Sequence, residues 1–165
     1  MRRMGRVLVA TWGVLSFAGL VYSLNFPARM VDGYSADDVV AVQWLRTNVP
    51  PGEVVVNDGF ADAGVWAPFK AGVRIVLPRI LNDGSLSART LVVEHIGQLD
   101  RNPEAARVAC AFGVRFVYYG AKVGEWDTRR FPPLEELRAS AALEEVFSNG
   151  GAVIFRVRQA CPATG

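Results

Sequence analysis

Two carboxylates that follow the start of a short apolar run, Asp58 and Asp62, are the residues best suited to acid–base chemistry. The run itself, "EVVVND", is rich in β-branched residues and is typical of a buried strand in a parallel sheet. Ligands bind at the carboxyl ends of such strands, where the two carboxylates would act as acid and base beside Asn57. Asn-Asp-Gly is also ordinary turn chemistry, and the tripeptide recurs at positions 82–84. This recurrence favours a turn that lets a buried strand leave the core.

A second candidate is one loop that places Trp126 among mixed charges, in the sequence "GEWDTRR". An aromatic side chain between charged groups is suited to contact with a sugar or a lipid head group. A solvated loop explains the same composition and is the favoured interpretation. Trp126 therefore joins Asn57, Asp58 and Asp62 as a candidate ligand-binding residue.

The remaining chemistry-bearing residues give little support for catalysis or a metal site. His95 is the only histidine, and we expect it to be a surface residue of a helix. The HExxH, GxSxG, GxGxxG and GxxxxGK[ST] patterns are absent from the sequence, so no cofactor is expected. Cys110 and Cys161 lack metal-ligand spacing. Two separate thiols are the simpler interpretation, and a disulfide is the alternative if the domain lies in an oxidising compartment.

An apolar segment precedes all of these residues. Val7 to Leu24 contains no charged residue, and its 18 residues would span about 27 Å as a helix, close to the thickness of a bilayer core. Arg2, Arg3 and Arg6 precede it, so the positive-inside rule places the N-terminus in the cytoplasm and the rest outside. The alternatives are a cleavable signal peptide and, less favoured, a buried helix of a soluble protein.

Charge and composition narrow the class of partner. The chain has 165 residues, of which 51% are hydrophobic, and a formal net charge of +2. Without the three N-terminal arginines, the chain has fifteen basic and sixteen acidic residues, and the basic residues are scattered along the sequence. Scattered charge without a basic patch gives no support for nucleic-acid binding.

Helical and strand patterns alternate through the rest of the chain. Helices are expected over 35–49, 61–69, 87–100, 102–112 and 134–142, and strands over 53–58, 73–78 and 114–120. Ser35 with Asp38 and Asn102 with Pro103 are typical of helix starts, and Pro68 is expected to stop the second helix. A hairpin with an Asn-Gly-Gly turn is expected over 143–158. The sequence therefore predicts a small α/β sandwich with a mostly parallel sheet and a C-terminal antiparallel hairpin. The predicted organisation is a cytoplasmic stub and transmembrane helix over 1–25, a linker over 26–34, an extracytoplasmic domain over 35–160 and a tail over 161–165.

The order of these segments resembles a known kind of domain. "ADDVVAVQWLRTNVPPGEVVVND", "DAGVWAPFKAGVRIVLP", "GVRFVYYG" and "LEEVFSNGGAVIFRVR" follow an apolar span. This pattern is similar to the C-terminal extracytoplasmic tail of bacterial multi-pass membrane proteins that resemble GT-C glycosyltransferases, including uncharacterised relatives. Those enzymes use polyprenyl-phosphate sugars and carry their catalytic acidic residue between early membrane spans. No such loop is present here, so no catalytic residue is carried over.

Two functional hypotheses follow. The first is a non-catalytic, membrane-anchored extracytoplasmic domain that is an accessory or C-terminal portion of a glycosyltransferase-like membrane protein. Its expected surroundings are the cell membrane and its lipid bilayer, with a polytopic membrane protein or a polyprenyl-linked sugar as partner. The alternative is a stand-alone cell-envelope enzyme, a hydrolase or transferase, that uses Asp58 and Asp62.

Overall fold

The computed structural model describes residues 34–59, 63–78, 86–121, 129–158 and 161. These residues belong to one compact unit, Gly33–Gly165. The predicted membrane span over Val7–Leu24 lies outside the described residues and stays a prediction. Within the described ranges, no helix has both the length and the apolar character that crossing a bilayer requires.

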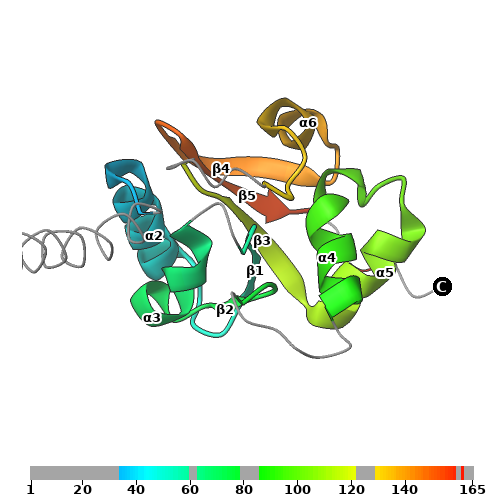
Figure 1. Ribbon diagram of the computed structural model, residues 1–165, viewed down its shortest axis with the longest axis horizontal. Coiled ribbons are helices and arrows are strands. Elements are labelled where there is room, and N and C mark those ends of the chain that lie inside the picture. The colour runs from blue at the N-terminus through cyan, green and yellow to red at the C-terminus, as the bar shows by residue number, and fades with distance from the viewer. Residues whose placement is uncertain (1–33, 60–62, 79–85, 122–128, 159–160, 162–165) are drawn as a thin grey trace, which may run out of the picture. The chain divides into compact units, whose positions relative to one another are not determined.

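A five-stranded sheet forms the centre of the fold (Figure 1). The strand order is β2-β1-β3-β5-β4. The pairings of β1 with β2 and β3 are parallel, whereas β5 pairs antiparallel with both β3 and β4. The α/β class and the C-terminal hairpin are confirmed, but the sheet is evenly mixed rather than mostly parallel, because β5 inserts beside β3. The strands are β1 (Val54–Val56), β2 (Arg74–Ile75), β3 (Val114–Tyr119), β4 (Leu143–Asn149) and β5 (Ala152–Val157).

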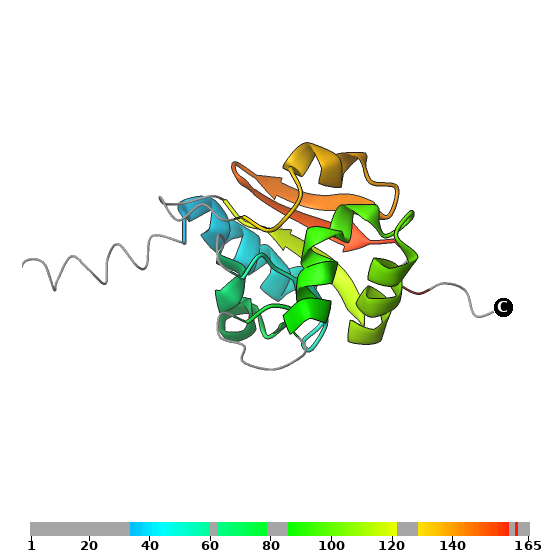
Figure 2. The same ribbon diagram turned by 45° about the vertical axis from the view of Figure 1, so that its right-hand side comes forward.

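Helices cover both faces of this sheet. Figures 1 and 2 show α2 and α3 on one side of the strands and α4 and α5 on the other. Two separate clusters of buried side chains correspond to these two faces. The helices are α2 (Ala36–Asn48), α3 (Ala67–Ala71), α4 (Leu86–Glu94), α5 (Pro103–Phe112) and α6 (Leu134–Ala139), with short 3-10 helices η1 (Ala63–Trp66) and η2 (Ile96–Gln98).

Two of the predicted helices differ from the observed ones by more than their terminal residues. Pro68 was expected to stop a helix, but it lies in the first turn of α3, where the missing N–H is tolerated. The helix expected over 87–100 is interrupted at His95, and η2 continues after it. Apolar periodicity runs through both segments of this region, so periodicity alone does not reveal the interruption.

The last strand is more deeply buried than its alternating pattern indicates. Ala152 and Ile154 are buried against the cluster below α2, while Val153, Phe155 and Val157 belong to the cluster on the opposite face. Of the residues of β5, Arg156 alone is exposed. Helices on both faces of the sheet explain why β5 lacks a polar face.

Candidate functional site

The carboxyl end of β1 holds a buried amide, Asn57, which is 0% exposed. Its Nδ2 donates to the carbonyl oxygen of Leu77 at 2.9 Å, and its Oδ1 accepts from the Leu77 N–H at 3.0 Å. This pair of bonds extends the contact between β1 and the chain that follows β2. Asn57 therefore has a structural role that uses both ends of its amide.

The neighbouring carboxylate, Asp58, is also 0% exposed. Its Oδ2 accepts hydrogen bonds from the backbone N–H groups of Arg130, at 2.7 Å, and Phe131, at 3.1 Å. The carboxylate thus fixes the chain that leads toward α6 against the end of β1. Hydrogen bonds from backbone N–H groups offset the free-energy cost of burying a carboxylate.

Gly59 completes the tripeptide with a backbone that requires glycine. Its φ is +84°, in the left-handed region, and an added Cβ would lie 2.8 Å from a side-chain carbon of Leu77. The predicted turn interpretation is therefore right about the glycine. It did not anticipate that Asn57 and Asp58 would be fully buried instead of facing water.

Replacing Asn57 with alanine is expected to lower the free energy of unfolding by about 2–3 kcal/mol, because two buried backbone groups of Leu77 lose their partner. Urea unfolding followed by circular dichroism measures this difference. The matched control is Asn48→Ala at the exposed end of α2, where about 1 kcal/mol or less is expected. Equal effects at the two positions would contradict the assignment.

Three guanidinium groups surround this edge of the sheet. Arg89 Nη1 donates to the carbonyl oxygen of Val76 at 2.7 Å, and Arg130 Nη1 donates to Thr90 Oγ1 at 3.0 Å. Arg129 lies over the ring of Tyr119, with 3.9 Å between the guanidinium carbon and the ring centroid. Its Nη2 donates to the carbonyl oxygen of Gly120 at 2.9 Å. These bonds tie the three arginines to the surrounding backbone and side chains.

The other two predicted site residues, Asp62 and Trp126, lie outside the described residues. Across the described ranges, no group of three or more His, Cys, Asp or Glu side chains is arranged to hold a metal ion. The pairing of Asp58 with Asp62 as acid and base therefore stays a prediction.

Asp38 is another fully buried carboxylate, and it was not among the predicted site residues. It lies in the first turn of α2, and its Oδ2 accepts from the backbone N–H of Ser35 at 2.9 Å and from Ser35 Oγ at 2.7 Å. Its Oδ1 accepts from Tyr118 Oη at 2.6 Å and from the Ala121 N–H at 3.0 Å. The capping box was readable from Ser35 and Asp38, but the contacts with β3 come from tertiary structure. Asp38 thus locks the start of α2 to the end of β3.

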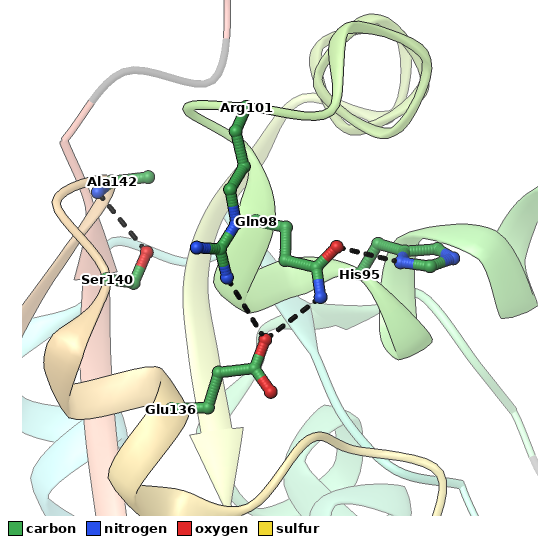
Figure 3. A network of polar contacts seen from close by, with 6 residues as sticks. All are labelled: His95, Gln98, Arg101, Glu136, Ser140 and Ala142. Carbon is green, nitrogen blue, oxygen red and sulfur yellow. Dashed lines mark hydrogen bonds and ion pairs between the residues drawn. The ribbon is translucent and has the colours of Figure 1, made fainter.

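A second network joins α6 to the turn after α4 (Figure 3). Gln98 Nε2 donates to Glu136 Oε1 at 2.9 Å, and Gln98 Oε1 lies 3.3 Å from His95 Nδ1. An amide oxygen only accepts, so this contact is a hydrogen bond when His95 Nδ1 carries a hydrogen. Arg101 reaches the same Glu136 oxygen at 3.5 Å, and its side chain is 65% exposed, so this ion pair contributes little. The only histidine is therefore half-buried and engaged in helix docking.

Cys110 and Cys161 form a disulfide with a Cα–Cα distance of 4.8 Å. Cys110 is on α5, and Cys161 lies four residues beyond the end of β5. The bond closes a loop with a sequence separation of 51 residues. It connects the chain after the last strand to the helix layer that covers one face of the sheet.

Residues 6–159 match a family described as a family of unknown function, DUF6541. No curated protein sequence matches the chain. Among solved structures, the fold is similar to the C-terminal globular domain of an oligosaccharyltransferase from Archaeoglobus fulgidus, with a TM-score of 0.50. The two sequences are 15% identical, and the similarity covers 75% of this chain and 98% of that domain, so it concerns the fold alone. Since the family match spans almost the entire sequence, the chain belongs to the DUF6541 family.

Proposed function

We propose that this chain is a non-catalytic, membrane-anchored extracytoplasmic domain that serves as an accessory or C-terminal portion of a glycosyltransferase-like membrane protein. The observation that carries the proposal is the fold, which is similar over nearly the whole length of an oligosaccharyltransferase C-terminal domain. The resemblance of the sequence to extracytoplasmic tails of GT-C-like proteins supports the same assignment. In this role the domain binds or assembles with a polytopic membrane protein, near its polyprenyl-linked sugar.

The geometry of the buried carboxylates also supports a role without chemistry. Asp38 and Asp58 are both fully buried and accept hydrogen bonds from the backbone of distant segments. A general acid or base must reach a substrate atom within hydrogen-bond distance, which these two side chains do not offer. Their role is to fix helices and loops around the sheet.

Membrane topology is tested first, with the full chain expressed in a bacterium. Arg107→Cys places one reactive thiol on an exposed position of α5, because both native cysteines are held in the disulfide. We expect a membrane-impermeant maleimide to label this thiol in intact cells with a permeabilised outer envelope. Arg3→Cys, before the apolar segment, is the matched control and should react only after lysis. Labelling of Arg107→Cys only after lysis would place the domain in the cytoplasm and end the proposal.

The accessory role is tested on the same chain by cross-linking in the membrane and mass spectrometry. The supporting result is a polytopic membrane protein that carries an acidic residue in its first outside loop. Recovery of the chain alone, under conditions where cross-links within the chain form, would contradict an accessory role.

A further inference from the structure

The large apolar side chains that are exposed within the described residues all belong to three elements of structure, α2, η1 and α3. Val39 and Val40 on α2 are 49% and 48% exposed, Trp66 at the end of η1 is 42% exposed, and Phe69 on α3 is 85% exposed. A phenylalanine that is mostly in water is unfavourable unless something covers it. We name these four side chains the α2–α3 apolar surface.

The helices that carry this surface lie side by side. α2 and α3 are in contact and cover the same face of the sheet (Figure 1). The ammonium group of Lys70 on α3 lies 5.6 Å from the ring centroid of Tyr34, directly before α2. On α3 the small residues Ala67 and Ala71 face the core, which directs Phe69 and Lys70 outward.

The composition of this surface is that of a membrane interface. Tryptophan is enriched at the membrane–water interface, and phenylalanine is typical of the apolar face of helices that lie in it. A lysine beside them places its charge in water while its stem covers apolar surface. The two carboxylates at the start of α2 are already engaged: Asp38 is buried, and Asp37 accepts from the Gly151 N–H and from Asn149 Nδ2. Both carboxylates are thus held by contacts within the domain.

The length of the preceding chain makes the bilayer reachable. Nine residues, 25–33, connect the uncharged segment ending at Leu24 to Tyr34, and nine extended residues reach about 30 Å at most. A tether of this length keeps the local concentration of the bilayer high, so even a few apolar side chains are enough for contact. A stable protein interface uses about 20–30 residues a side, which is far more than four side chains.

We infer that the α2–α3 apolar surface rests in the head-group region of the bilayer, with Phe69 and Trp66 inserted and Lys70 near the lipid phosphates. This inference rests on the proposed membrane-anchored function and adds the orientation of the domain. It implies that α4 and α5, on the opposite face of the sheet, point away from the membrane.

The test uses the full chain reconstituted in vesicles of phosphatidylethanolamine and phosphatidylglycerol, with Trp66 as the only tryptophan. Trp12, Trp44 and Trp126 are replaced with phenylalanine for this purpose. We expect lipids brominated near the head group to quench about half or more of the Trp66 fluorescence, as for an interfacial indole. Adding Phe69→Ser should remove most of this quenching. Because Phe69 is 85% exposed, the thermal unfolding midpoint should stay unchanged.

The matched control places the only tryptophan on α5, as Arg107→Trp with Trp66→Phe, where no lipid quenching is expected. Equal quenching at both positions would overturn the orientation.

A second copy of the chain covering the surface would shield Trp66 from iodide but leave it insensitive to brominated lipid. That result would also overturn the proposed orientation. If Trp66 stays unquenched while the chain floats with the vesicles, the inference falls and anchoring stands. Failure of the chain to float would refute the anchoring itself.

Discussion

Replacing Asp38 with alanine is expected to lower the free energy of unfolding by about 3–5 kcal/mol, which is among the largest effects of a single substitution. The carboxylate caps α2 through Ser35 and accepts from Tyr118 Oη and the Ala121 N–H in a fully buried position. Alanine would remove the carboxylate oxygen that accepts from the buried Tyr118 hydroxyl and from the Ala121 N–H. The helix would also lose its capping box, which is worth about 1 kcal/mol by itself.

Chemical denaturation of four variants separates these contributions. Asp38→Ala, Tyr118→Phe and the double variant form a cycle with the parent chain, and we expect a coupling of about 1–3 kcal/mol between the two side chains. Gln43→Ala on the exposed side of α2 is the control, with an expected change within about 0.5 kcal/mol. Additive effects of Asp38→Ala and Tyr118→Phe would show that the 2.6 Å contact contributes nothing to stability.

Removing the disulfide by Cys110→Ala together with Cys161→Ala is expected to lower the free energy of unfolding by up to about 4 kcal/mol. The estimate follows from the entropy of closing a loop with a separation of 51 residues in the unfolded chain. Unfolding of the oxidised parent and of the double variant in urea measures the difference. A loss of this size is a large part of the stability of an ordinary domain.

Reductant provides the control for this pair of substitutions. It should bring the parent chain close to the stability of the double variant and should leave the double variant unchanged. If the parent unfolds at the same urea concentration with and without reductant, the bond does not constrain the chain in solution. Reaction of the native cysteines with a maleimide before reduction would contradict the bond itself.

Local sequence patterns predicted the elements of this fold well. Ser35 and Asp38 indicated the start of α2, Asn102 and Pro103 that of α5, and the Asn-Gly-Gly turn the final hairpin. These signals act within a few residues, where side-chain chemistry determines the backbone directly. Pro68 was assigned the opposite role because a proline ends one helix and begins another equally well.

The candidate site was less predictable, because its contacts join distant parts of the chain. Asn57 was read as a turn residue, yet its partner is Leu77, twenty residues away. Asp58 is held by the backbone of Arg130 and Phe131, and Asp38 by Tyr118 and Ala121. A carboxylate in a helix cap or a turn looks the same in sequence whether it faces water or a strand from the other half of the domain. Burial decides between these possibilities, and burial is a property of the fold.

The order of strands in the sheet has a consequence for how the chain is made. β1 lies between β2 and β3, and β3 lies between β1 and β5, the last strand among the described residues. Until residues 152–157 have been synthesised, one edge of β3 has no strand to pair with and the five-stranded sheet is incomplete. Pairing between distant strands is slow because the intervening loop must be ordered first. A domain whose last described strand occupies an inner position of its sheet can therefore complete that sheet only after all five strands have been synthesised.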